Sequence, residues 1–212
     1  MRLVFVHDNR FKVDEEGNLY SGGNFSNEVF KRYLDVCDEL IVIGRCETIR
    51  SSDGQGYNSI DLGKISFVAM DNVSSISGVL KRPAVQCELR EVIKKSDGVI
   101  CRSSVLGFMA AKEAMRCGKP YLIEVVGCTF DSLWNHGSLK GKFYAPYAFI
   151  KAKKYIQKSR YTLYVTSQFL QKRYPTEGQW IACSNVELDK IEELSFENRL
   201  IRINKRADGT PI

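Results

Sequence analysis

Apolar residues along the chain gather in short runs that have the length of β-strands. Most of these runs lack strict alternation of apolar and polar positions, which indicates strands buried on both faces of a sheet. The runs lie at residues 1–8, 39–44, 65–70, 98–102, 120–127, 161–167 and 179–185. Between several of them, apolar positions recur every three or four residues, as in a helix with one buried face. This order predicts an α/β fold with a doubly wound, mostly parallel sheet.

The segment between the first two of these runs carries the most specific local pattern. Residues 16–18 predict a hairpin turn, and Gly22 and Gly23 come directly before a helix that Ser26 would cap. The two glycines either make a tight turn or let backbone N–H groups approach an anionic ligand. They do not match the dinucleotide-binding fingerprint, because no third glycine follows at the required spacing.

The last part of the chain differs from the rest. The alternating run "RLIRINKR" at 199–206 predicts one more strand, and no helical pattern follows it. A strand without a partner helix suggests the start of another unit. We therefore expect one domain over 1–186, and a linker with the start of a missing C-terminal domain over 187–212.

Composition narrows the class of protein. The chain has 212 residues, a net charge of +6 and seven cysteines, and the cysteines lie mostly inside apolar runs without a C-x-x-C pair. This usage is typical of buried thiols in a reducing compartment, so we expect a cytoplasmic location. No run reaches the roughly 20 apolar residues of a membrane span.

Ligands of an open parallel sheet lie beyond the carboxyl ends of its strands, so residues that follow strands are the site candidates. His7 and Asp8 follow the first run, and Arg102 and Ser103 follow the fourth. Arg102 could clamp a phosphate or carboxylate, or it could form an ion pair with a neighbouring acid.

The richest segment follows the fifth run, and we interpret it as a loop. It combines Glu124, Asp131, Trp134 and His136. A ring beside a carboxylate and an imidazole suits a sugar, because the ring packs on the apolar sugar face and the polar groups take its hydroxyls. The chain has only two histidines and no D-x-D motif, so we expect no metal site.

The charge pattern shows one long gap. Residues 132–176 contain no Asp or Glu, while lysines, including Lys151, Lys153, Lys154 and Lys158, alternate there with aromatic residues. Such a region suits an anionic bilayer surface or nucleic acid. The alternative is a solvated lysine face.

Three segments together resemble a known family. "ICRSSVLGFMAAKEAMRCGKPYLIEVVGCTFDSLWNHG", "YVTSQFLQKRYPTEG" and "CSNVEL" are similar to the N-terminal domain of bacterial family 4 glycosyltransferases with the GT-B fold, which act in polysaccharide and lipopolysaccharide assembly. The resemblance implies two Rossmann-like domains, of which the first takes the acceptor and the second the nucleotide sugar, and transfer with retention of configuration. Val186 departs from the family's usual glycine, and the family's usual histidine is not evident.

The resemblance implies a metal-independent glycosyltransferase without cofactors, which moves a sugar from a nucleotide-sugar donor to a lipid-linked glycan at the inner face of the plasma membrane. This chain alone should be inactive, since the donor domain is missing. The expected residues are Asp131 and His136 for catalysis, Gly22, Gly23, Arg102, Ser103, Glu124 and Trp134 for donor phosphate or acceptor, and Lys151, Lys153, Lys154 and Lys158 for the membrane. The alternative is a non-catalytic binding module for nucleic acid or another polyanion, although we expect no nucleic acid as partner.

Overall fold

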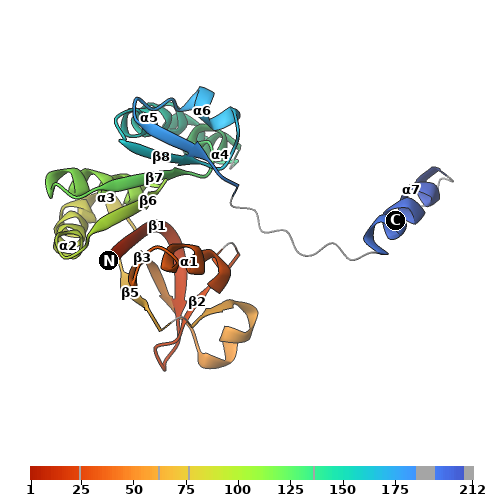
Figure 1. Ribbon diagram of the computed structural model, residues 1–212, viewed down its shortest axis with the longest axis horizontal. Helices are drawn as coiled ribbons and strands as arrows, with labels where there is room; N and C mark the ends of the chain where they lie inside the picture. Colours follow the sequence, from red (N-terminus) through yellow and green to blue (C-terminus); the bar gives the residue numbers. More distant parts are fainter. Residues whose placement is uncertain (24, 62, 76, 136, 185–193, 208–212) are drawn as a thin grey trace.

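The computed structural model describes the chain apart from residues 24, 62, 76, 136, 185–193 and 208–212 (Figure 1). Within the described residues, parallel strands form most of one sheet. Their order is β5 (Ile65–Ala69), β3 (Glu39–Thr48), β1 (Arg2–Val13), β6 (Gly98–Arg102), β7 (Tyr121–Val125), β8 (Tyr161–Tyr164) and β9 (Gln179–Ala182). Two short strands extend the sheet beside the second half of β1: β2 (Leu19–Ser21) pairs antiparallel with β1, and β4 (Asn58–Ile60) pairs antiparallel with β2. The predicted mostly parallel α/β sheet is confirmed.

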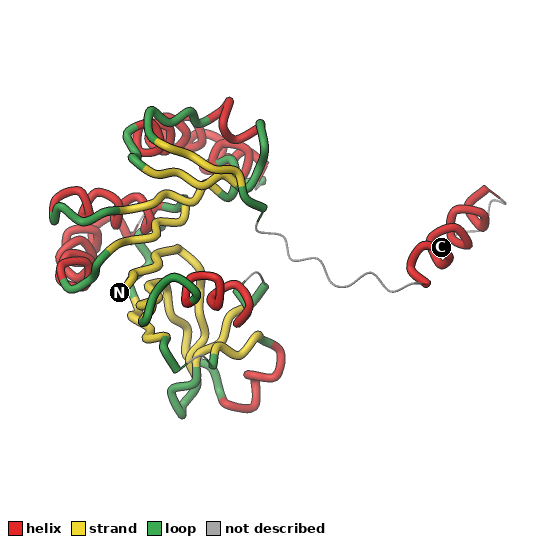
Figure 2. The backbone as a smooth tube through the Cα atoms, viewed as in Figure 1, coloured by secondary structure: helices red, strands yellow, loops and turns green. Residues whose placement is uncertain are grey.

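Helices connect the strands, and Figure 2 shows how they lie around the sheet. They are α1 (Asn27–Leu34), α2 (Arg82–Lys94), α3 (Val105–Arg116), α4 (Thr129–Asn135), α5 (Leu139–Gln157), α6 (Phe169–Arg173) and α7 (Leu194–Ala207). Two 3₁₀ turns, η1 (Ser51–Gly56) and η2 (Ser77–Lys81), lie in the connections around β4 and β5.

The alternating side chains of β1 separate two hydrophobic cores. Val4 and Val6 pack with α2 and α3 on one face of the sheet. Phe5 and Phe11 point to the other face. There they pack with residues of α1, including Phe30, and with residues that precede this helix. This division follows from the period of two along a strand. The α1 side is the less covered, because α3 and α5 pack together on the opposite side.

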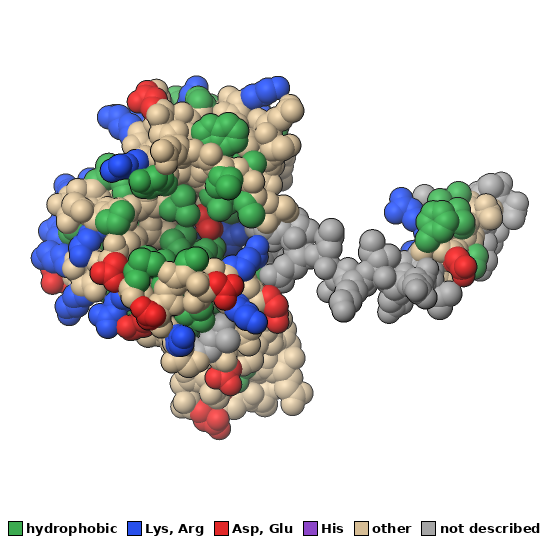
Figure 3. Space-filling model, viewed as in Figure 1, with side chains coloured by type: hydrophobic (Ala, Val, Ile, Leu, Met, Phe, Trp, Pro, Cys, Tyr) green, Lys and Arg blue, Asp and Glu red, His purple; other side chains and the backbone are tan. Residues whose placement is uncertain are grey.

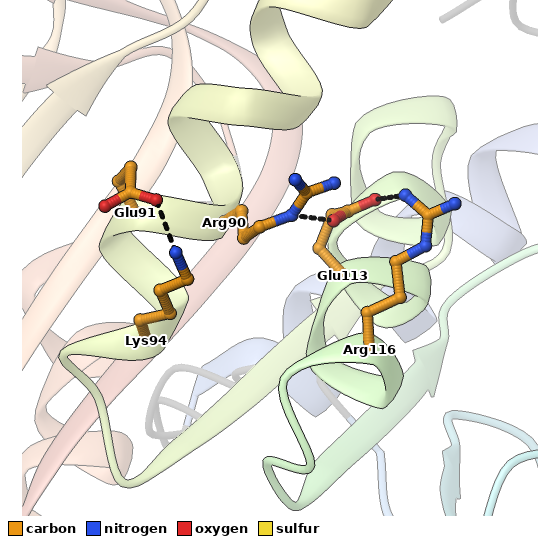
Figure 4. A network of polar contacts seen from close by, with 5 residues as sticks. All are labelled: Arg90, Glu91, Lys94, Glu113 and Arg116. Carbon is orange, nitrogen blue, oxygen red and sulfur yellow. Dashed lines mark hydrogen bonds and ion pairs between the residues drawn. The ribbon is translucent and has the colours of Figure 1, made fainter.

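Helices α2 and α3 are joined by a charge cluster around the buried Glu113 (Figure 4). Its carboxylate accepts hydrogen bonds from Arg90 Nε at 2.9 Å and from Arg116 Nη1 at 3.0 Å. A second pair, Lys94 with Glu91 at 2.7 Å, lies on the exposed side of α2. The buried carboxylate is therefore paired on both oxygens, as its burial requires.

Local signals in the sequence set several element boundaries, among them the predicted Ser26 cap and the predicted hairpin turn at 16–18. Ser26 caps α1 by accepting a hydrogen bond from Val29 N at 3.4 Å. Gly17, in the hairpin between β1 and β2, has a φ of +86°. Gly118 has a φ of +65° directly after α3. Both glycines take a conformation that other residues adopt at a cost.

Two predictions of local structure are wrong. The run at 199–206, expected as a strand, lies in helix α7. Its apolar positions, with Phe196 before them, also fit a helical stripe through Phe196, Leu200 and Ile203, so the alternation alone did not decide the period. The segment after β7, expected as a loop, contains α4, in which Phe130 and Trp134 stack one turn apart at 5.2 Å.

Strand β9 departs from the expected double burial. Its residues are exposed, including Trp180 and Ile181. It lies at the end of the strand order, next to β8. An edge strand pairs on one side only, which accounts for this exposure.

Candidate functional site

Two cavities flank the sheet where β6 and β7 end, one on each face. The edge cavity, of about 550 Å³, is lined by residues of α2, α3, α4 and α5 and by Asp8, Ser103 and Ser104. The face groove, of about 600 Å³, is lined by residues of α1 and of β6, β7 and β8. The edge cavity lies in the region where open parallel sheets bind ligands, whereas the face groove also extends along the strands to residues at their amino ends, such as Asp97 and Pro120.

Adjacent residues at the end of β6 serve different cavities. Arg102 lines the face groove, whereas Ser103 lines the edge cavity. Ser103 is also fixed in place, because its hydroxyl accepts a hydrogen bond from Val126 N at 3.3 Å and its N–H donates to Glu124 O at 2.8 Å. The predicted pair therefore does not form a single anion clamp.

Asp8 is the carboxylate of the edge cavity. One carboxylate oxygen accepts hydrogen bonds from Ser74 Oγ at 2.7 Å and Val105 N at 3.1 Å, and the other accepts from Leu106 N at 3.3 Å. The Asp8 carboxylate thus caps N–H groups in the first turn of α3, and Ser104 Oγ accepts a hydrogen bond from Gly107 N. Burial raises the pKa of Asp8, against the opposing effect of these hydrogen bonds.

Three of roughly four acceptor positions on the Asp8 carboxylate are used, so its second oxygen retains capacity for one more donor. Serine and threonine side chains line the same cavity, at Ser74, Ser103, Ser132 and Thr129. Tyr144 and Tyr155 also line it. A cavity with hydroxyls, a carboxylate and aromatic rings suits a polyhydroxylated ligand.

The face groove is mostly apolar, and at its carboxyl end Arg102 and Glu124 lie buried, each with 5% of its surface exposed. Figure 3 shows hydrophobic side chains gathered in a hollow in the middle of this face of the molecule. Arg102 Nε lies 3.7 Å from Glu124 Oε2, and the guanidinium lies over the Phe25 ring at 4.9 Å. Tyr33 donates a hydrogen bond to Glu124 Oε1 at 2.8 Å. Of the two roles predicted for Arg102, the structure contains the ion pair.

Burial is the main influence on the pKa values of the ionisable side chains in this cluster. It raises the pKa of Glu124, which Arg102 partly opposes, and it raises the pKa of Tyr33. His7 lies beside Phe25, at 5.4 Å between rings, and burial together with the Arg102 charge lowers its pKa to about 3. His7 is therefore neutral at physiological pH.

Gly22 and Gly23 lie after β2, away from both cavity linings. Gly23 has a φ of +70°, and a Cβ added there would meet nothing within 4 Å. Its carbonyl accepts a hydrogen bond from Asn58 Nδ2 at 3.0 Å. The backbone of Gly23 thus requires a glycine for its conformation, and its proposed contact with a ligand stays a prediction.

The other predicted residues of the sugar site are not assembled with Glu124. Asp131, on α4, pairs with Arg173 Nη2 at 2.8 Å. Trp134, also on α4, is 45% exposed and stacks on Phe130. His136 lies outside the described residues. The catalytic and sugar-binding roles of these residues stay predictions.

The predicted basic residues lie on α5 and at its end. Lys153, Lys154 and Lys158 are exposed, whereas Lys151 is partly buried and lines the edge cavity. The face of α5 opposite its buried alanines carries a stripe of exposed apolar side chains, spaced by four, four and three residues. This apolar stripe consists of Leu139, Phe143, Tyr147 and Ile150, with 74%, 85%, 55% and 66% of their surfaces exposed.

Sequence reasoning missed several residues that the structure places at the cavities. Tyr33 was not singled out, yet its hydroxyl donates a hydrogen bond to Glu124. Arg82 and Lys112 were not singled out, although they line the edge cavity. Tyr33 offered a weak signal, since a tyrosine in an otherwise apolar stripe usually has a partner for its hydroxyl.

Two general features of the described part of the chain complete the picture. Its His, Cys, Asp and Glu side chains do not gather in groups of three or more that could hold a metal ion. Its helices include none with the length and apolar character needed to cross a membrane.

Comparison with known proteins gives one clear relative. The chain is 35% identical over 191 residues to Protein CapJ of Staphylococcus aureus, an alignment that covers 88% of the chain. It spans about half of that relative, 48% of its length. No family model matches the chain.

Among solved structures, the chain overlaps in part with a UGT transferase from Siraitia grosvenorii in complex with UDP, with a TM-score of 0.45 and 10% identity over 95% of this chain and 55% of that one. It also overlaps with a putative UDP-N-acetylglucosamine 2-epimerase from Listeria monocytogenes, with a TM-score of 0.43 and 12% identity over 93% of this chain and 50% of that one. At these values the overlaps do not identify a function.

Proposed function

We propose that this chain is the acceptor-side domain of a glycosyltransferase that transfers a sugar from a nucleotide-sugar donor to a lipid-linked glycan in cell-surface polysaccharide synthesis. The observation that carries the proposal is the edge cavity, where the Asp8 carboxylate and several hydroxyl side chains line a cavity of about 550 Å³ at the carboxyl edge of the sheet. The family resemblance of the sequence supports it. The similarity to a relative of about twice the matched length supports a two-part protein.

In this proposal the edge cavity holds the acceptor sugar. The free position on the Asp8 carboxylate accepts a hydrogen bond from an acceptor hydroxyl and so orients its oxygen. That oxygen bonds to the anomeric carbon of the donor sugar as the bond to the nucleoside diphosphate breaks; the diphosphate leaves with the electron pair and takes up the proton of the acceptor hydroxyl. Asp8 is a positioning residue in this scheme, and the donor is held by residues outside this chain.

The apolar stripe of α5 supports association with a membrane. An exposed row of Leu139, Phe143, Tyr147 and Ile150 is costly in water, and it carries lysines on both sides, among them Lys153 and Lys158. Such a helix lies in the plane of a bilayer surface with its apolar side chains among the acyl chains. A nucleic acid would engage the lysines but would not cover the apolar row, so the stripe favours a lipid surface over a polyanion.

The test of transfer uses the longest natural protein that contains this chain, incubated with radiolabelled nucleotide sugars and a lipid extract of its own cells. We expect label in the lipid fraction, and at least a tenfold loss of kcat/KM for Asp8→Asn but no loss for the exposed Asp61→Asn. Absence of labelled lipid with every common nucleotide sugar would contradict the proposal. Titration of the present chain with the same donors should show only weak binding, and micromolar affinity would oppose the assignment to the acceptor side.

A further inference from the structure

Three cationic side chains from three helices line the edge cavity. Arg82 comes from the start of α2, Lys112 from α3 and Lys151 from α5. Among the described residues that line the cavity, only Asp8 carries a carboxylate. The positive charges thus outnumber the negative ones on the wall.

All three cations are partly buried, and none forms an ion pair with a carboxylate among the described residues. Within the described residues, Lys112 and Lys151 form no ion pair, and the Arg82 guanidinium donates to a neutral carbonyl, Val73 O, at 3.1 and 3.2 Å. Some lysines outside the cavity do lie in ion pairs: Lys12 with Glu47 at 2.6 Å, Lys81 with Asp71 at 2.7 Å and Lys94 with Glu91 at 2.7 Å.

Asp8 forms no ion pair with these three cations. Its oxygens already accept from Ser74 and from two N–H groups of α3. Partly buried cations without a counter-ion repel one another and lose part of their hydration, so such a set is unfavourable unless an anion joins it.

From this charge set we infer that the edge cavity takes an anionic ligand, a molecule whose phosphate or carboxylate group is held by Arg82, Lys112 and Lys151 while its hydroxyls reach the serines. The inference rests on the proposed function and deepens it, since it makes the acceptor negatively charged near the sugar that receives the transfer. Two sources share this chemistry, namely a phosphate that links the glycan to its lipid and an acidic sugar within the glycan. An arginine and two lysines suit either, because all three carry charge-assisted donors.

The experiment titrates the present chain with inorganic pyrophosphate, with glucuronate and with neutral glucose, and follows backbone amide shifts of the cavity-lining residues by NMR. We expect at least one anion to shift the amides around Lys112 and Tyr155, with affinity that falls as salt is added, and glucose to be at least tenfold weaker. A stronger response to pyrophosphate would assign the phosphate source, and a stronger response to glucuronate would assign the acidic sugar.

The variants make the inference specific to the cavity. Lys112→Gln combined with Lys151→Gln should weaken anion binding at least tenfold. Lys153→Gln, on the same helix as Lys151 but exposed and outside the cavity, should leave anion binding unchanged.

No shift with either anion, equal response to glucose, or equal binding by the double variant would overturn the inference. Sugar transfer by the longer protein to a neutral acceptor, unaffected by the double variant, would overturn it while leaving the proposed function intact. Anion binding by this chain, without any sugar transfer by the longer protein, would support the inference and contradict the proposed function.

Discussion

The carboxylate of Asp8 accepts a hydrogen bond from the backbone N–H of Val105 at 3.1 Å, across 97 residues of sequence. The contact ties β1 to the first turn of α3, next to the bond from Leu106. Helix N-termini have N–H groups without partners in the helix, and a carboxylate there is favourable. A side chain of the chain itself thus occupies the place where many α/β proteins bind a phosphate.

Removal of Asp8 should therefore cost stability as well as activity. Asp8→Ala leaves two N–H groups of α3 and the Ser74 hydroxyl without their acceptor, so we expect a loss of about 2 kcal/mol in the free energy of unfolding. Asp53→Ala, whose exposed carboxylate pairs with Arg50 at 3.6 Å, should cost less than about 0.5 kcal/mol. Urea unfolding measures both, and equal midpoints would contradict the capping role.

His7 should make the protein sensitive to mild acid. Its folded pKa is lowered to about 3 from an ordinary value of 6.5, so between these values the unfolded chain binds a proton that the folded chain does not. The stabilisation from neutral His7 is complete above pH 6.5 and is lost progressively as the pH falls toward 3, on the order of 5 kcal/mol in all. Stability measured at pH 7.5, 6 and 5 should fall more steeply for the wild type than for His7→Gln. Parallel curves would exclude the effect.

Glu113 and Glu91 provide a matched comparison on neighbouring helices. Glu113 is fully buried between Arg90 and Arg116, whereas Glu91 pairs with Lys94 in solvent. Glu113→Ala should cost about 2 kcal/mol, because it leaves a cavity and two arginines without a partner, although both can reach water. Glu91→Ala should cost less than about 0.5 kcal/mol. Thermal and urea unfolding would show whether the two differ.

The apolar stripe of α5 predicts lipid binding that does not depend on charge alone. Phe143→Ser with Ile150→Ser removes two exposed apolar side chains that a bilayer would bury, each worth about 1.5–3 kcal/mol when fully buried. Flotation with anionic vesicles should fall at least tenfold for this pair of changes. Leu80→Ser, which removes a side chain 87% exposed outside α5, is the control and should float like the wild type. If none of the three proteins floats, the stripe is not a membrane surface.

Gly23 tests whether the glycine turn matters for conformation or for a ligand. Alanine meets no atom within 4 Å there, but it must adopt a φ of +70°, so Gly23→Ala should cost about 1 kcal/mol. Gly56→Ala also has open space, without a positive φ, and should cost less. Stability and sugar transfer of the longer protein are compared in both variants. A loss of transfer far beyond the loss of stability would support a ligand contact at Gly23.

The sequence by itself determined most of the secondary structure. The order of strands and helices could be predicted because the signals for them are local. Such signals are the spacing of apolar residues, the cap at Ser26, and the turn glycines Gly17 and Gly118. One error arose where one pattern fitted two periods. In 199–206, closely spaced apolar residues satisfied both strand alternation and a helical stripe, and the helix formed.

Only the tertiary structure decided which side chains share a cavity. Arg102 and Ser103 are neighbours in sequence, but successive residues of a strand point to opposite faces, so one joined Glu124 in the face groove and the other joined Asp8 in the edge cavity. The bond between Asp8 and Val105 and the meeting of Arg82, Lys112 and Lys151 depend on how helices pack across the sheet. No local sequence pattern encodes such contacts, because the residues that they join are far apart along the chain and their spacing does not follow the period of a helix or a strand.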